Sequence, residues 1–265
     1  MLTIDLQDTT AVVTGGSSGI GLATAELFMR AGAAVAICGR DERRLGQARE
    51  SLLALHPQAR LMAERCDVLV RNEVEQFAFA VKERFGGADV LVNNAGQGRV
   101  STFADTADEA WAEELRLKFF SIINPTRAFL PLLEQSSKGA VVCVNSLLAL
   151  QPEPHMVATS AARAGTQNLI RSLATEFAPK GVRVNSILIG LVESGQWQRR
   201  FDAREDKALD WAQWTAQLAA RKGIQLGRLG KPEEAAQAIV FLATPMSSYT
   251  TGGHIDISGG LARHI

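Results

Sequence analysis

The sequence predicts an α/β protein, in which a doubly wound parallel β-sheet carries helices on both faces within a single domain. Short, mostly apolar runs alternate with segments of helical periodicity along all 265 residues. Continuous apolar runs are typical of strands that are covered on both faces. A glycine-rich turn joins the first run to the first helical segment. A chain of this length fits one domain with one layered core.

Seven strands and six helices are expected in this order. The apolar runs lie at residues 11–14, 34–38, 61–66, 89–93, 140–145, 182–188 and 254–257. Helical patterns begin at residue 19 and cover residues 41–55, 72–85, 107–133, 158–177 and 232–243, with Pro125 as a potential kink. Pro232, Glu233 and Glu234 favour a helix start, because proline fixes φ and acids suit the positive end of the helix.

The composition argues against several classes of partner. Lysine plus arginine and aspartate plus glutamate both number 28, so the chain lacks the basic excess of a nucleic-acid or anionic-membrane surface. No apolar stretch reaches the length of a membrane span. Cys38, Cys66 and Cys143 form no C-x-x-C pair, which indicates reduced thiols and a cytoplasmic protein. The four histidines have no metal-ligand spacing, so no metal is expected.

The turn Thr-Gly-Gly-Ser-Ser-Gly-Ile-Gly at residues 14–21 predicts a phosphate-binding site. Glycines there permit a tight turn and a close approach of backbone to pyrophosphate, and the helix N-terminus offers free N–H groups. A plain strand–helix turn is the alternative, but the following βαβ unit favours a dinucleotide. The candidate cofactor-binding residues are Gly15, Ser17, Ser18, Gly19, Ile20 and Gly21.

The spacing Gly-x-x-x-Gly-x-Gly resembles that of the short-chain dehydrogenase/reductase family. Further marks follow in the family's order: Asp67-Val68, Asn93-Asn94-Ala95-Gly96, Asn145-Ser146, Arg183-Val184-Asn185, and a C-terminal segment from Gly227 to Gly260. The resemblance covers essentially the whole chain. It implies one Rossmann-type domain over residues 1–265, with a substrate-binding insertion at about 191–227. It also implies that Asp67 and Val68 hold the adenine and that Asn94, Ala95 and Gly96 line the middle of a nicotinamide cofactor.

The end of the second expected strand indicates NADP(H). Gly39 stands where NAD-preferring relatives place an aspartate, and Arg40 follows. A guanidinium pairs with the 2′-phosphate of NADP(H), whereas a carboxylate would repel it. Arg40 as a solvated loop charge is the alternative. Asp41 either reaches the ribose or caps the next helix.

The catalytic positions depart from the family. Its Tyr-x-x-x-Lys pattern reads Thr159-x-x-x-Arg163 here, Lys118 occupies the position of its asparagine, and only Ser146 matches. A threonine hydroxyl is a far weaker acid than a phenol. Arg163 can donate to the nicotinamide ribose but does not release a proton. Lys118 can release a proton if a partly dry site lowers its pKa. The alternative is that its side chain faces solvent, as most lysines do.

The segment after the sixth expected strand completes the candidate site. By resemblance, Ser194 replaces the threonine that binds the nicotinamide carboxamide, with Gly190 beside it. The aromatic residues that follow either line an apolar or aromatic substrate pocket or pack onto the domain or a neighbouring subunit. They are Trp197, Phe201, Trp211 and Trp214. His155 is a second titratable candidate, with a surface or capping role as its alternative.

We therefore expect an NADP(H)-dependent oxidoreductase that acts on a small carbonyl or alcohol substrate through a non-standard active site. Ser146 would hold the substrate oxygen, and Lys118, water or a substrate group would supply the proton. The resemblance also implies a homo-oligomer, either a tetramer or a dimer. Two alternatives remain. One is a catalytically silent NADP(H)-binding protein. The other is a non-redox enzyme on the same fold, like the halohydrin dehalogenases, which have an arginine at the position of Arg163.

Overall fold

A single seven-stranded sheet organises the protein, which we describe from a computed structural model over residues 5–263. All its pairings are parallel, in the order β3-β2-β1-β4-β5-β6-β7. The strands are β1 (Thr10–Thr14), β2 (Ala34–Gly39), β3 (Leu61–Arg65), β4 (Val90–Asn93), β5 (Ala140–Ser146), β6 (Arg183–Ile189) and β7 (His254–Ile257). The predicted doubly wound parallel sheet is confirmed.

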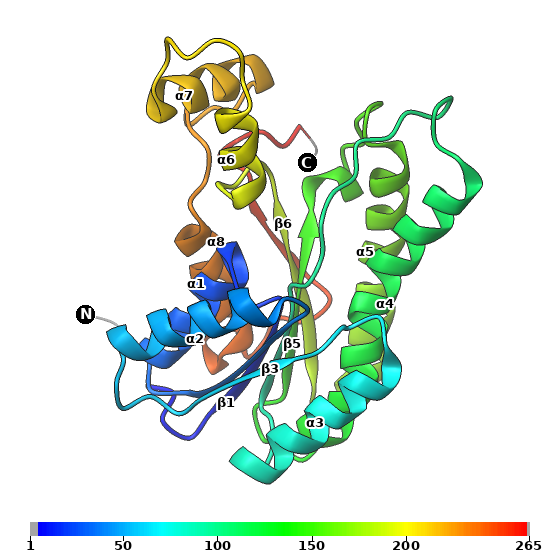
Figure 1. Ribbon diagram of the computed structural model, residues 1–265. Coiled ribbons are helices and arrows are strands. Elements are labelled where there is room, and N and C mark those ends of the chain that lie inside the picture. Colours follow the sequence, from blue (N-terminus) through cyan, green and yellow to red (C-terminus); the bar gives the residue numbers. More distant parts are fainter. Residues whose placement is uncertain (1–4, 264–265) are drawn as a thin grey trace.

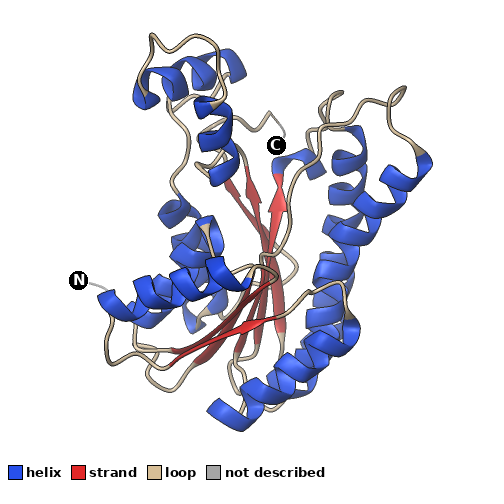
Figure 2. Ribbon diagram, viewed as in Figure 1, coloured by secondary structure: helices blue, strands red, loops and turns tan. Residues whose placement is uncertain are grey.

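Helices cover both faces of this sheet (Figures 1 and 2). One face carries α1 (Gly19–Arg30), α2 (Glu42–Leu55) and α8 (Pro232–Ala243), and the other carries α3 (Arg71–Phe85), α4 (Asp108–Leu133) and α5 (Val157–Phe177). Two further helices, α6 (Gly195–Asp202) and α7 (Trp211–Lys222), stand apart from these layers at the end of the sheet where β6 finishes. They lie within the predicted insertion.

The hydrophobic core forms two layers, one on each face of the sheet. Phe28, Ile37 and Ile239 are fully buried between the sheet and the α1–α2–α8 layer. Phe129 and Ile170 are fully buried on the opposite face. This burial on both faces explains why the strands read as continuous apolar runs rather than as alternating ones.

Local signals account for where several helices begin. Asp41 caps α2, because its side chain accepts a hydrogen bond from the Arg44 backbone N–H at 3.0 Å. Pro232 is the first residue of α8, as the sequence predicts. α4 runs unbroken from Asp108 to Leu133 with Pro125 and Pro131 inside it, so Pro125 does not end the helix. Among the described residues, no helix is long and apolar enough to cross a membrane.

Candidate active site

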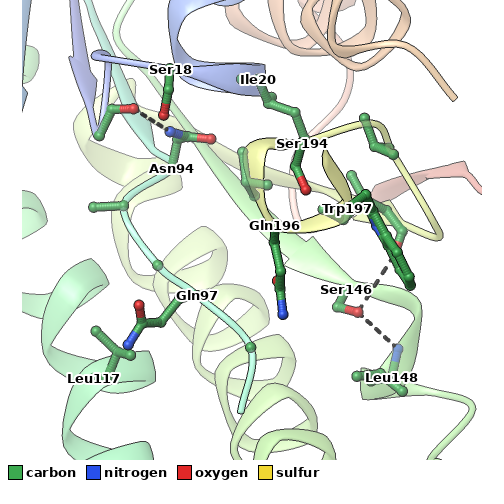
Figure 3. Close-up of a pocket in the computed structure, with 18 of the residues that line it drawn as sticks. Ser18, Ile20, Asn94, Gln97, Leu117, Ser146, Leu148, Ser194, Gln196 and Trp197 are labelled. Atoms are coloured by element: carbon green, nitrogen blue, oxygen red, sulfur yellow. Dashed lines mark hydrogen bonds between the residues drawn. The ribbon is translucent and has the colours of Figure 1, made fainter. Parts of the chain in front are cut away.

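One large cleft opens at the carboxyl ends of the strands, where ligands bind in open α/β sheets. Its volume is about 910 Å³. Figure 3 shows Ser194, Gln196 and Trp197 entering it from the start of α6, opposite Gln97 and Leu117. Most of the predicted cofactor and catalytic residues line this cleft: Gly15, Ser17, Ser18, Gly19, Ile20, Arg40, Asp67, Val68, Asn94, Ala95, Gly96, Ser146, Arg163, Gly190 and Ser194.

The glycine-rich turn has the geometry of a phosphate cradle. Gly15 and Gly19 have positive φ values of 66° and 54°. A Cβ at Gly19 would meet no atom within 4 Å, so the backbone there faces open space at the start of α1. A Cβ at Gly21 would instead lie 2.3 Å from the Gly15 carbonyl oxygen, so Gly21 allows the helix to approach the turn rather than lining the cleft. These features fit a dinucleotide pyrophosphate.

Two guanidinium groups lie at the adenosine end of the cleft. Arg40 is exposed after β2, and Arg44 on the first turn of α2 donates to Ser18 Oγ at 2.9 Å. Arg44 therefore ties α2 to the glycine-rich turn and adds a second positive charge beside Arg40. Arg44 is not among the residues predicted from the sequence, although its position four residues after Arg40 is a usable signal. Two cations at this end fit a 2′-phosphate.

Asn94 fixes the middle of the cleft. Its side-chain amide donates to the carbonyl oxygens of Thr14 at 2.9 Å and Gly15 at 3.1 Å. The Thr14 hydroxyl in turn accepts hydrogen bonds from the backbone N–H groups of Asn94 and Ala95. These bonds hold the end of β4 against the glycine-rich turn, so two segments about 80 residues apart form one continuous wall.

Ser146 and Arg163 lie where the family resemblance placed them. Ser146 Oγ accepts from the Leu148 N–H at 3.2 Å, and a weak contact of 3.5 Å reaches the Ile189 carbonyl oxygen. Arg163 donates to the Val144 carbonyl oxygen at 2.9 Å. Burial lowers the pKa of Arg163 to about 10, so the side chain keeps its charge at neutral pH. Its buried Nε has no hydrogen-bond partner in the structure, which leaves a donor available near the cleft.

Lys118 and Thr159 lie behind the wall of the cleft rather than in it, because both side chains are buried and neither lines the cavity. The Lys118 ammonium donates to Glu114 Oε1 at 2.6 Å and to the Gln97 carbonyl oxygen at 2.5 Å. The Thr159 hydroxyl also donates to Glu114. Burial, with a smaller contribution from the Arg163 charge, lowers the pKa of Lys118 to about 8. The alternative that Lys118 faces solvent is therefore wrong.

The loop after β4 separates this buried group from the cleft. The Arg99 backbone N–H lies 3.3 Å from Thr159 Oγ1, and Ser101 pairs with Met156 in an isolated parallel bridge. Gln97 belongs to this loop and lines the cleft, while its carbonyl oxygen holds Lys118. The ammonium group is thus one residue away from the cavity.

The aromatic residues of the insertion pack mainly against one another. The ring centroids of Phe201 lie 5.2 Å from Trp211 and 5.6 Å from Trp214, and Trp197 lies 6.4 Å from Trp214. Of the four rings, Trp197 alone lines the cleft. The other three join α6 to α7, so they do not line an aromatic substrate pocket.

A charged group lies at the end of the cleft next to α7. Glu153 Oε2 is 3.0 Å from Lys222 Nζ and 3.4 Å from His155 Nδ1, and all three residues line the cavity. The contact joins the end of α7 to the loop before α5. The two charged partners are 69 residues apart, so no sequence pattern pairs them. His155 is exposed, with 50% of its side chain accessible, and it also lines the cleft, so it is a surface residue at the edge of the site.

Comparison with known proteins agrees with this geometry. Residues 15–262 match the family model described as enoyl-(acyl carrier protein) reductase. The chain is 31% identical to a 3-oxoacyl-(acyl-carrier-protein) reductase of Thermotoga maritima, over 97% of this chain and 98% of the relative. A doubly wound parallel sheet with a glycine-rich turn and Ser146 at the carboxyl edge defines a nucleotide-binding oxidoreductase fold. The chain belongs to the short-chain dehydrogenase/reductase family.

Two solved structures of one relative are more similar still. A short-chain oxidoreductase from Pseudomonas aeruginosa PAO1, described as containing an atypical catalytic center, is 69% identical in its apo form. The TM-score is 0.97, over 98% of this chain and 100% of that one. Its NADPH-bound structure gives 68% identity and a TM-score of 0.95, over 98% and 99% of the two chains. An L-sorbose reductase from Gluconobacter frateurii, solved with NADPH and L-sorbose, is 30% identical with a TM-score of 0.93, over 100% of both chains.

Proposed function

We propose that the protein is an NADP(H)-dependent oxidoreductase that interconverts a carbonyl and an alcohol without a catalytic tyrosine. The observation that carries this proposal is one continuous cleft, which joins the glycine-rich turn, the two arginines at its adenosine end, and Ser146 with Arg163 farther along it. The chain's one tyrosine, Tyr249, is exposed and does not line the cleft. The NADPH-bound P. aeruginosa relative supports NADP(H) as the cofactor.

The residues of this chain divide the work between binding and proton transfer. Ser194, Asn94 and Arg163 orient the cofactor, which supplies or accepts hydride when bound. Ser146 donates a hydrogen bond to the substrate oxygen. Thr159 is held by Glu114 and does not take part directly. Lys118, with its pKa lowered to about 8, is the group best suited to exchange a proton near neutral pH, through water.

The insertion at about 191–227 forms the substrate end of the cleft in this proposal. Trp197 supplies an apolar wall there, while Glu153, His155 and Lys222 supply polar groups. A small substrate with an apolar body and a polar end suits this lining better than a wholly aromatic one. The relatives act on carbonyl substrates according to their names, a 3-oxoacyl reductase and an L-sorbose reductase. This likeness supports the reaction class but not a particular substrate.

We further propose a cytoplasmic homo-oligomer, either a tetramer or a dimer. Leu115 and Phe120 on α4 are 40% and 42% exposed, although both are large apolar side chains. A second copy of this chain packed along α4 and α5 would cover them.

A binding and turnover experiment tests the proposed function. NADPH fluorescence should change on titration with the protein, and NADPH should be consumed when ketones and aldehydes are added. Gly21→Ala should abolish binding, since its Cβ would collide with the Gly15 carbonyl oxygen. Gly46→Ala is the matched control, because a Cβ there meets nothing within 4 Å. Absence of NADPH binding by the unmodified protein would refute the proposal.

A catalytically silent NADP(H)-binding protein is the second candidate. The observation that favours it is the burial of Lys118 and Thr159 behind the loop of Gln97 and Arg99. Single-turnover measurements at high protein concentration separate the two candidates. NADPH binding without oxidation by any carbonyl in a broad panel would support the silent protein.

A further inference from the structure

The Lys118 ammonium lies in surroundings that disfavour its charge. The side chain is only 1% exposed, and burial is the main cause of its lowered pKa. Arg163 on α5 and Arg99 on the loop after β4 add repulsion. An isolated buried ammonium is costly, and such a group loses its proton unless a partner compensates the charge.

Glu114 is the acidic group that compensates it. Its side chain is buried one helical turn before Lys118 on α4, and its Oε1 lies 2.6 Å from Lys118 Nζ. The hydrogen bond and the charge of Glu114 both raise the pKa of Lys118, against burial and the two arginines. The neighbouring Glu113 is exposed and pairs with Arg99 Nη2 at 2.8 Å instead. The two adjacent acids thus have different partners and different surroundings.

The same carboxylate oxygen also accepts the hydroxyl of Thr159 on α5. A carboxylate oxygen has room for two donors. Glu114 thereby joins α4 to α5 and contacts both Lys118 and Thr159, which occupy the positions of the family's asparagine and tyrosine. With Lys118 also bound to the Gln97 carbonyl oxygen, the ammonium is held in one place between α4, α5 and the cleft-lining loop.

We propose that Glu114 is the positioning residue of this active site, which fixes the Lys118 side chain and keeps it protonated at neutral pH. Glu114 does not line the cleft and touches no reacting group. It acts through Lys118. Without the carboxylate, the ammonium would face burial and two guanidinium groups alone. The kinetic part of this inference rests on the proposed function, whereas the titration of Lys118 does not.

The direct test is a pH titration of Lys118 in the Glu114→Gln variant. NMR of the labelled lysine Nζ atoms monitors the titration, without cofactor or substrate. The amide keeps the shape of the side chain and removes its charge. The Lys118 resonance is identified by its loss in Lys118→Met. Its titration midpoint should fall by about one to three pH units, the usual effect of losing a close opposite charge. Glu113→Gln is the matched control and should leave the midpoint unchanged. An unchanged midpoint in Glu114→Gln would overturn the proposal.

Kinetics give a second readout. A fall of about two pH units would leave roughly a tenth of Lys118 protonated near pH 7, so carbonyl reduction should drop about tenfold there and recover in more acidic buffer. The KM for NADPH should not change. If Lys118→Met retains full activity, the assignment of Lys118 as the proton donor in the proposed function is wrong. The titration still decides whether Glu114 acts on Lys118.

Folding of the variants is a further control. If Glu114→Gln alone does not fold, the double variant Glu114→Gln with Lys118→Met should, because it removes both buried charges together. Recovery of folding would support an action through Lys118. Failure of the double variant as well would count against it, because Glu114 would then be needed for another reason.

Discussion

The buried lysine should make the stability of this protein rise with pH in alkaline solution. Lys118 has a pKa of about 8 in the folded chain, against an ordinary value of 10.5. Below about pH 8 the lysine is protonated in both states, and the folded state bears the full cost of the buried charge. Between the two pKa values the unfolded state binds more protons, so the free energy of unfolding increases with pH. The contribution is complete above about pH 10.5.

The size of this effect follows from the difference between the two pKa values. At about 1.4 kcal/mol for each pKa unit, the shift from 10.5 to about 8 corresponds to about 3 kcal/mol over the window. The Lys118 side chain is 1% exposed, so screening by solvent reduces this figure little. Other groups also titrate at alkaline pH, so a difference against a reference variant is required.

The double variant Lys118→Met with Glu114→Gln is the suitable reference. The single variant would leave the Glu114 carboxylate buried without its lysine, so a second buried charge would change together with the first. Urea unfolding of both proteins at a series of pH values from about 7 to 11 gives the difference in unfolding free energy. The unmodified protein should gain about 3 kcal/mol relative to the variant as the pH rises through the full window. A constant difference, or one that falls with pH, would refute the buried, destabilised lysine.

Three further predictions concern cofactor choice, catalysis and assembly. Arg40→Ala should weaken NADPH binding by roughly ten- to a hundredfold in fluorescence titrations and leave NADH binding nearly unchanged, because a charge-assisted hydrogen-bond set contributes about 1.5–3 kcal/mol; equal affinities of the unmodified protein for both cofactors would contradict this. Lys118→Met should lower kcat for carbonyl reduction by about 10²- to 10⁴-fold and remove one limb of the pH profile, with NADPH binding intact; full activity would exclude Lys118 as the acid. Light scattering at micromolar concentration should give the mass of a dimer or tetramer. Substituting the exposed Phe120 on α4 by lysine should weaken the association of the subunits. A monomer would refute the proposed assembly.

The framework of this protein was readable from its sequence because each element has a local signal. Apolar runs bounded by turns located the seven strands to within a residue or two, and β7 was predicted with its observed bounds. The glycines in the first turn predicted a tight turn, and the structure has positive φ values, which favour glycine, at Gly15 and Gly19. The predicted cofactor-binding motifs lie together along the cleft, because the carboxyl ends of parallel strands meet at one edge of the sheet.

The buried pair of Glu114 and Lys118 was not readable in the same way. Glu114 and Lys118 are four residues apart on a helix, a spacing that usually indicates an exposed ion pair. Only the packing of α5 and of the Gln97 loop over α4 buries them. The aromatic residues of α6 and α7 were equally ambiguous, because helical spacing does not distinguish a pocket wall from an internal contact. Glu153 and Lys222 meet only through the tertiary fold.

The hydrogen bonds around Thr159 have a consequence for how such a site can change during evolution. Its hydroxyl accepts from the Arg99 amide and donates to Glu114, which in turn balances Lys118. A lone mutation to tyrosine at 159 would disturb all of these partners, and a lone loss of Lys118 would strand a buried carboxylate. We expect each intermediate to be less stable than either end point, because residues that share one hydrogen-bond network do not contribute additively to stability. We therefore expect Glu114, Lys118 and Thr159 to be kept or replaced together rather than one at a time.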